Sequence, residues 1–336
     1  METKILDCSP EGVSEASRLL KQGCVVAVPT ETVYGLAADA LNRVAVAEIF
    51  NIKGRPQDNP LIVHVSSIDM WKSLVKQLPD KALALAEAFW PGPLTIILEK
   101  GSHIPDETTA GLDTVAVRMP NHSCFLGIIN EAGIPMAAPS ANLSGSPSPT
   151  CAKHCEDDLK GKVPLIIDGG ECSVGIESTV LALIDKPTVL RPGAITPAMI
   201  SKVLGEEVYI SDSLNKLIKD GPVQSPGMKY KHYSPKAKIT LANGSREKYF
   251  DFVNSLDEGI HCLVFDGEEK LTNHPCVAYG GLHDLNEQSK KLFAALRKLD
   301  ETGAATVYAR CPDINEESMG VYNRLLCAAA FEVLDL

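Results

Sequence analysis

The sequence predicts an α/β protein: a twisted mixed sheet with flanking helices, followed by a smaller, Rossmann-like α/β domain. Short apolar runs alternate with segments of helical spacing through the first two thirds of the chain. The 336 residues exceed the roughly 100–200 that one core usually serves. A stretch dense in proline and glycine then separates two α/β regions. We therefore predict domains at 1–210 and 238–336, joined by a linker at 211–237.

Helix boundaries in the first domain follow from capping residues. Ser9 followed by Pro10 is typical of a helix start, and Gly23 of a helix end. Pro91 and Pro93 cannot continue the helix that precedes them. We expect the other helices at 42–52, 81–89 and from Thr196 to Gly205. Short apolar runs predict strands at 24–28, 61–65, 94–99, 114–118, 134–138, 165–168 and 178–184.

The predicted linker contains the sequence DGPVQSPG at 220–227, followed by MKYKHYSP at 228–235. Proline and glycine at this density indicate an ordered loop between domains. Bending at these residues could let the loop close as a lid between the domains. Beyond it we expect strands at 239–241, 262–265 and 306–309, and helices near 247–255 and 285–302.

Composition excludes several classes of protein. A chain with 45% hydrophobic and 22% charged residues is not expected to be disordered. No apolar run approaches the ~20 residues that span a bilayer, and the start METKILDCSPEG lacks a signal-peptide pattern. We therefore expect a cytoplasmic protein without membrane contact. The net charge of -11 argues against a large basic face, so RNA binding is predicted to be weak at most.

The ten cysteines are scattered and form no CxxC pair, so we expect reduced, mostly buried thiols. Cys151, His154 and Cys155 form one cluster that could hold zinc. A second pair of ligands at suitable spacing is missing, so no metal site is predicted.

The strongest local signal is the sequence NIKGRP at 51–56, followed by Asn59 and Pro60. In an extended chain, Lys53 and Arg55 would point to one side. Two cations on one side suit a polyphosphate, which Arg can bind through two parallel hydrogen bonds. A solvated basic turn explains the spacing equally well.

A second signal is PSANLSG at 139–145, which follows an apolar strand. Hydroxyl groups, an amide and backbone N–H groups at a strand end can bind phosphate or carboxylate oxygens. Taken alone, the segment fits an ordinary Asx or Ser turn better.

Two more strand ends carry polar residues. PTETVYGL at 29–36 is either a turn or the wall of a pocket. Arg118 ends a predicted strand and shares one face with Ala116 and Thr114. It could bind a ligand or form a structural ion pair, and His64 fits a core histidine. The chain lacks the GxxxxGK[ST], GxSxG, HExxH and EF-hand patterns, so ATP would not be bound by a P-loop.

Taken together and in order, these motifs resemble the YrdC family in its long, two-domain form. The matching segments are PTETVYGL (29–36), KGRP and DNPLIVH (53–64), WPGPLT (90–95), VAVRMP (115–120), PSANLSG (139–145), EST (177–179), LRPG (190–193) and KHYSP (231–235). They cover about the first 205 residues and the linker.

The resemblance implies a nucleotidyltransferase that makes threonylcarbamoyl-AMP and pyrophosphate from L-threonine, bicarbonate or CO2, and ATP. Threonine would be held by Thr32, His64, Arg118, Ser140 and Ser178, with Arg118 on its carboxylate. ATP would contact Lys53, Arg55, Asn59, Thr114, Asn142, Thr150, Arg191 and Tyr233.

In the implied reaction, a threonine carbamate attacks the α-phosphate of ATP. Lys53 and Arg55 would act as the catalytic cations, and Mg2+ would arrive with ATP. A transient partner, the complex that transfers the threonylcarbamoyl group to tRNA beside the anticodon, would consume the product. The alternative is an RNA-binding module of the same fold without synthase activity, which the acidic net charge disfavours.

Overall fold

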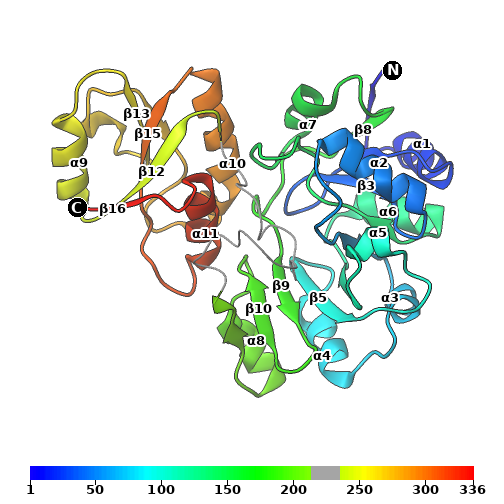
Figure 1. The fold of residues 1–336 in the computed structure, drawn as a ribbon. Coiled ribbons are helices and arrows are strands. Elements are labelled where there is room, and N and C mark those ends of the chain that lie inside the picture. The colour runs from blue at the N-terminus through cyan, green and yellow to red at the C-terminus, as the bar shows by residue number, and fades with distance from the viewer. Residues whose placement is uncertain (213–234) are drawn as a thin grey trace.

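The computed structural model describes residues 1–212 and 235–336, which form two α/β domains side by side (Figure 1). An 11-stranded sheet lies in the N-terminal domain and a 5-stranded sheet in the C-terminal domain. The larger sheet mixes parallel and antiparallel pairs, and the smaller one is parallel throughout. The predicted fold class is confirmed. Tyr233 and most of the predicted linker lie outside the described residues.

The larger sheet has the strand order β1-β8-β2-β3-β7-β4-β6-β5-β9-β10-β11. Its central strands are buried on both faces, so they appear in the sequence as continuous apolar runs. The strands are β1 (Lys4–Asp7), β2 (Val26–Val28), β3 (Gly35–Asp39), β4 (Ile62–His64), β5 (Leu94–Glu99), β6 (Thr114–Arg118), β7 (Met136–Ala137), β8 (Leu165–Asp168), β9 (Thr179–Ala182), β10 (Thr188–Arg191) and β11 (Tyr209–Ile210).

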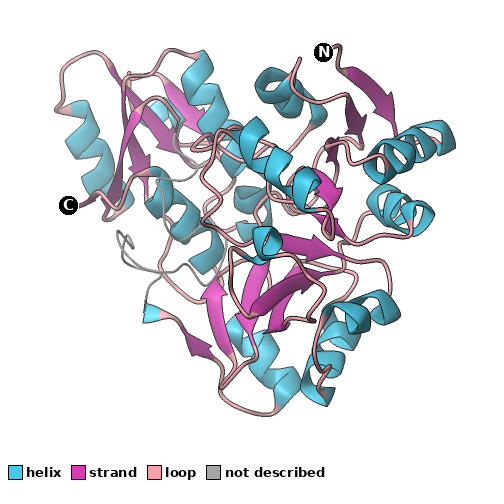
Figure 2. Cartoon of the chain, turned by 45° about the vertical axis from the view of Figure 1, so that its right-hand side comes forward, coloured by secondary structure: helices cyan, strands magenta, loops and turns pink. Residues whose placement is uncertain are grey.

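Helices flank this sheet (Figure 2), and the caps at Ser9 and Gly205 confirm the helix start and the helix end predicted there. The Ser9 hydroxyl accepts a hydrogen bond from the Gly12 N–H at 3.3 Å, and Gly205 ends the last helix with φ 68°. The helices are α1 (Pro10–Lys21), α2 (Arg43–Lys53), α3 (Ile68–Leu74), α4 (Asp80–Phe89), α5 (Asp106–Thr109), α6 (Ser123–Ala132), α7 (Ala152–Leu159) and α8 (Pro197–Leu204).

The prediction of an extended chain from Lys53 to Arg55 is wrong. Lys53 is the last residue of α2, and Gly54 caps that helix in the left-handed conformation with φ 63°. Since a Cβ at this φ is strained, glycine at this position lets the chain leave the helix sharply. Some elements had no predicted counterpart, among them β1, β3, β10, α3, α6 and α7.

Helices cover both faces of the smaller sheet, whose order is β14-β13-β15-β12-β16. Side chains alternate between the two faces along each strand. Ala242 and Cys262 pack with α9, whereas Leu241 and Leu263 pack with α10 and α11. The elements are β12 (Lys238–Asn243), β13 (Ile260–Val264), β14 (Cys276–Ala278), β15 (Thr306–Arg310), β16 (Val333–Asp335), α9 (Arg246–Asn254), α10 (Leu285–Glu301) and α11 (Met319–Ala328).

The two domains share a packed interface. Helices α10 and α11 lie on the side of the C-terminal domain that faces the N-terminal domain (Figure 1). Val33 and Ile176 of the N-terminal domain pack into the core of the C-terminal domain.

Among the residues that the structure describes, no helix has both the length and the apolarity to cross a bilayer.

Candidate active site

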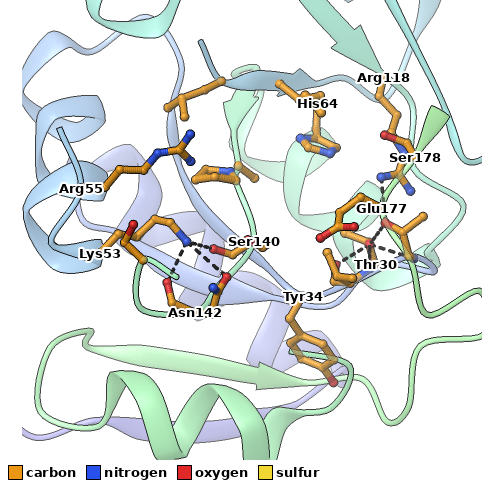
Figure 3. Close-up of a pocket in the computed structure, with 18 of the residues that line it drawn as sticks. Thr30, Tyr34, Lys53, Arg55, His64, Arg118, Ser140, Asn142, Glu177 and Ser178 are labelled. Carbon is orange, nitrogen blue, oxygen red and sulfur yellow. Dashed lines mark hydrogen bonds between the residues drawn. The ribbon is translucent and has the colours of Figure 1, made fainter. Parts of the chain in front are cut away.

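A cavity with about 810 Å³ of empty space, part of it open to solvent, lies in the N-terminal domain. Its walls come from the loop between β2 and β3, the end of α2, strands β4 and β6, the loop after β7, and the segment from Glu177 to Arg191. Figure 3 shows Lys53 and Arg55 on one side and Arg118, Ser178 and Glu177 on the other. Segments far apart in sequence therefore converge on one polar cavity.

Most of the predicted site residues line this cavity. They are Thr32, Lys53, Arg55, His64, Arg118, Ser140, Asn142, Ser178 and Arg191. Thr30, Ser144, Ser146 and Glu177 also line it, although no ligand contact was predicted for them. Each of these four lies in or beside one of the sequence motifs, so closeness to a motif was the signal that could have found them.

Three predicted residues are not among those that line the cavity. Asn59 is fully buried and donates a hydrogen bond to Asp58 at 3.4 Å. Thr150 packs against His154, whose Nδ1 accepts a hydrogen bond from the Thr150 N–H at 3.2 Å. Thr114 lines a different hollow together with Lys186. Although Thr114 shares a strand face with Arg118, the two lie ~13 Å apart at ~3.3 Å per residue.

Lys53 supports the loop that follows β7. Its ammonium group donates hydrogen bonds to the Ser140 carbonyl, to the Asn142 carbonyl at 2.7 Å and to the Asn142 Oδ1 at 3.3 Å. An ammonium has three protons, so this loop takes up its donor capacity. Burial, and secondly the charge of Arg55, lower the pKa of Lys53 to about 7. Lys53 thus holds the 140–142 loop in place and puts an amine that titrates near neutral pH in the wall of the cavity.

Arg118 joins an ion pair to the cavity wall. Its Nη2 lies 2.6 Å from the Glu31 Oε2, and both side chains are about 5% exposed or less. Its Nη1 donates to the Thr32 hydroxyl at 2.9 Å, and its Nε to the Gly92 carbonyl at 3.1 Å. The structural ion pair considered for Arg118 is therefore present, and the side chain also lines the cavity.

The turn that carries Thr32 is fixed by Thr30. The Thr30 hydroxyl donates to the Val33 carbonyl at 2.7 Å and accepts from the Thr32 N–H at 3.1 Å. A hydroxyl that bonds to nearby backbone groups replaces the hydrogen bonds of a strand with those of a tight turn. The segment 29–34 is therefore both a turn and a pocket wall.

His64 places a neutral ring in the cavity wall. It is 3% exposed, and its ring centroid lies 5.5 Å from that of Phe125. Burial, and secondly the charge of Arg118, lower its pKa to about 3. Within the described residues its Nδ1 has no hydrogen-bond partner. The imidazole therefore keeps a buried ring nitrogen without a partner in the wall of the cavity.

Arg191 holds Ser178, which lies across the cavity from Lys53 and Arg55 (Figure 3). Its Nε donates to the Ser178 carbonyl at 3.0 Å, and its Nη2 to the Ser178 hydroxyl at 3.1 Å. The Ser178 and Thr95 hydroxyls lie 2.8 Å apart. Beside them, Glu177 bonds to the Ser148 hydroxyl at 2.5 Å and to Arg324 at 2.8 Å. Arg324 belongs to α11, so the C-terminal domain reaches this wall.

The cysteines form no disulfide, and half of them are buried, fewer than predicted. His154 bonds to Thr150 beside the Cys151 and Cys155 pair. The described residues contain no group of three His, Cys, Asp or Glu side chains arranged to hold a metal ion.

Two family models match the chain in succession. One, described as "Telomere recombination" and named for Sua5, YciO and YrdC proteins, matches residues 18–193. The other, described as "Threonylcarbamoyl-AMP synthase, C-terminal domain", matches residues 195–330.

Curated relatives extend the match over both domains. The threonylcarbamoyl-AMP synthase of Pyrococcus abyssi is 42% identical, over 95% of this chain and 94% of its own length. The enzyme of the same name from Bacillus subtilis is 41% identical, over 99% of this chain and 97% of its own. A putative threonylcarbamoyl-AMP synthase from Mycobacterium tuberculosis is 37% identical, over 60% of this chain but 96% of its own length.

Solved structures give the same result. The crystal structure of P. abyssi Sua5 in complex with L-threonine superposes with a TM-score of 0.92 at 38% identity, covering 100% of this chain and 99% of that one. A double-alanine variant of the same protein superposes with a TM-score of 0.93 at 39% identity, with 99% and 98% coverage.

Proposed function

Since this chain belongs to the Sua5, YciO and YrdC family in its two-domain form, we propose that it is a threonylcarbamoyl-AMP synthase that uses L-threonine, bicarbonate or CO2, and ATP. We assign residues 1–210 to the catalytic domain, 211–237 to the linker and 238–336 to the C-terminal domain. The product would pass to the complex that modifies tRNA beside the anticodon. One observation carries the proposal: cationic and hydroxyl side chains from distant segments meet in one cavity.

The threonine half of the cavity would lie around Arg118. Its guanidinium is fixed by Glu31 and Thr32, and this preorganised cation suits a carboxylate. The neutral His64 ring and the hydroxyls of Thr32, Ser140 and Ser178 would contact the amine and side chain of threonine. A structure of a Sua5 protein with L-threonine bound supports this use of the fold.

The nucleotide half would lie around Arg55. Arg55 and Arg191 line the cavity and would contact phosphate oxygens, while Asn142 would contact the nucleotide. Lys53 would act through its charge, because its donors are held by the 140–142 loop. Asn59, Thr150 and Tyr233 are proposed as ATP contacts on family resemblance. Thr114 is omitted because it lines another hollow.

The proposed chemistry needs no covalent intermediate with the protein. The neutral threonine nitrogen attacks CO2 and loses a proton to water, which gives a carbamate. A carbamate oxygen then attacks the α-phosphorus of ATP as the bond to pyrophosphate breaks. The protein's contribution is to hold the reactants in line and stabilise charge. Of the described lining residues, Glu177 alone carries a carboxylate, and Arg324 holds it. Mg2+ would therefore be held mainly by phosphate oxygens and water, and would offset charge on the phosphates.

Incubation with ATP, L-threonine and bicarbonate tests the function directly. We expect pyrophosphate and threonylcarbamoyl-AMP to form together, and omission of threonine to abolish both. Pyrophosphate release that does not depend on threonine would contradict the proposal. RNA binding that weakens with salt, without turnover of ATP, would favour the RNA-binding alternative.

Arg55→Ala is expected to raise the KM for ATP and slow pyrophosphate release. A hydrogen bond to a charged group contributes about 1.5–3 kcal/mol, so kcat/KM for ATP should fall roughly tenfold to hundredfold. Arg43→Ala is the matched control. It removes an arginine at the opposite end of α2, whose side chain is 69% exposed and lies 3.7 Å from Glu107. Equal activity of both variants would show that the nucleotide binds elsewhere.

ATP binding should also take up a proton through Lys53. The pKa of Lys53 is about 7 without a ligand, so near pH 8 the amine is mostly neutral. Phosphate charge would raise that pKa, and about one proton should bind per ATP. Near pH 6 the amine is already charged and this uptake should vanish. Calorimetry in buffers of different ionisation enthalpy measures the uptake. Lys53→Met, if folded, should remove it, and unchanged uptake in that variant would contradict the assignment.

A further inference from the structure

Arg324, a residue of the C-terminal domain, places its positive charge against Glu177 in the wall of the cavity. This side chain of α11 is completely buried. Its Nε donates to the Glu177 carboxylate at 2.8 Å, its Nη2 to the Glu177 carbonyl at 3.2 Å and its Nη1 to the Pro192 carbonyl at 2.8 Å. It thereby joins the two segments that carry Ser178 and Arg191.

Close packing fixes the position of α11 against these segments. A Cβ at Gly320 would lie 2.9 Å from the Ile176 side chain and 3.3 Å from Gly193. Gly193 itself leaves no room, because a Cβ there would lie 2.6 Å from the Thr179 backbone nitrogen. The helix and the wall are therefore in direct backbone contact, and Arg324 has little freedom to move away from Glu177.

A second arginine holds the neighbouring wall. Arg297 of α10 donates to the Pro147 carbonyl at 2.6 Å and to Asp158 at 2.8 Å. Ser148, the next residue along the chain, donates to Glu177 at 2.5 Å. Arg324 therefore contacts Glu177 directly, and Arg297 is linked to it through the 147–148 segment.

The charge balance at Glu177 depends on Arg324. Burial by itself would raise the pKa of Glu177, but the charges of Arg324 and Arg191 together hold it below its ordinary value. If Arg324 were absent, a buried carboxylate would remain in the cavity wall with Arg191 as a nearby cation. Such a carboxylate would compete with phosphate oxygens for Arg191 and repel the phosphates.

We propose that Arg324 is a positioning residue for the adenylation site: it neutralises Glu177, so that Arg191 and Ser178 keep the arrangement that the ligands require. The inference rests on the proposed function for the identity of those ligands. It gives the C-terminal domain a role in forming the binding site, beyond any support of a linker.

The test compares Arg324→Met with Arg310→Met in the full chain. Arg310 forms a similar buried ion pair with Glu268 at 2.9 Å, but within the C-terminal domain. Calorimetry measures the Kd of ATP and of L-threonine separately, and thermal unfolding measures stability. We expect both variants to lose stability. Only Arg324→Met should weaken ATP binding, by about tenfold or more, while Arg310→Met should stay within about twofold of the unmodified protein.

Neutralising Glu177 separates charge from packing. In the Glu177→Gln background, Arg324→Met should change the Kd of ATP by no more than about threefold, because the competing carboxylate is gone. Should Arg324→Met not fold, Arg324→Gln, which also removes the charge but keeps a hydrogen-bond donor, replaces it in the same comparison.

Two results would overturn the inference. One is unchanged ATP binding in a folded Arg324 variant. The other is an equal loss of ATP affinity whether the Arg324 substitution is made in the unmodified chain or in the Glu177→Gln background. The Kd of ATP is measured without turnover, so the comparison of variants can be interpreted even if the unmodified protein is inactive. Inactivity of the unmodified protein would contradict the proposed function and not this inference.

Discussion

Replacing Arg118 with methionine is expected to abolish measurable L-threonine binding and also to lower the free energy of unfolding by about 3–5 kcal/mol. The first effect follows from the proposed contact between its guanidinium and the threonine carboxylate. The second follows from Glu31, whose carboxylate would stay buried without the cation that lies 2.6 Å away. Calorimetry with L-threonine and denaturant unfolding measure the two effects separately.

A double variant distinguishes the two roles of Arg118. Glu31→Gln removes the buried charge that Arg118→Met leaves behind, so the double variant should recover most of the lost stability. It should still not bind threonine, because no cation is restored. Recovery of threonine binding in the double variant would contradict the assignment of Arg118 to the carboxylate.

Removing residues 236–336 is expected to leave a folded N-terminal domain with at least about a hundredfold less synthase activity. The two large cores of that domain draw their residues from positions 6–208, so it has a core of its own. The truncation nevertheless removes Arg324 and Arg297, and exposes Val33 and Ile176. The segments that carry Ser178 and Arg191 thereby lose the contacts that position them, and a hundredfold loss corresponds to ~2.7 kcal/mol of transition-state stabilisation.

Tryptophan fluorescence tests whether the shortened chain folds. Trp71 and Trp90, the two tryptophans of the chain, both lie in the N-terminal domain with ring centroids 4.4 Å apart. Their emission should match that of the full chain if the domain keeps its fold. A chain that ends at residue 235 retains Tyr233 and all but the last two residues of the linker, so full activity of that chain would defeat the proposed role of the C-terminal domain.

The sequence predicted helices and strands correctly where residues close together in the chain set their ends. Ser9 and Pro10 start α1, Gly205 ends α8, and the apolar run 94–99 is β5. These signals succeed because caps and strand periodicity depend on residues that are neighbours in the chain. The extended conformation expected at Lys53 was wrong, because helix α2 runs one residue beyond its predicted end and includes Lys53.

The sequence by itself determined the two-domain α/β class, and most of the site residues that it predicted line the cavity, because the polar motifs follow strands and the family pattern is continuous. Only the tertiary structure decided what each residue contacts. It showed Lys53 bonded to the 140–142 loop, Thr114 in another hollow, and Arg324 paired with Glu177 across 147 positions of the chain. Such contacts depend on how distant segments pack, and no local propensity encodes that packing.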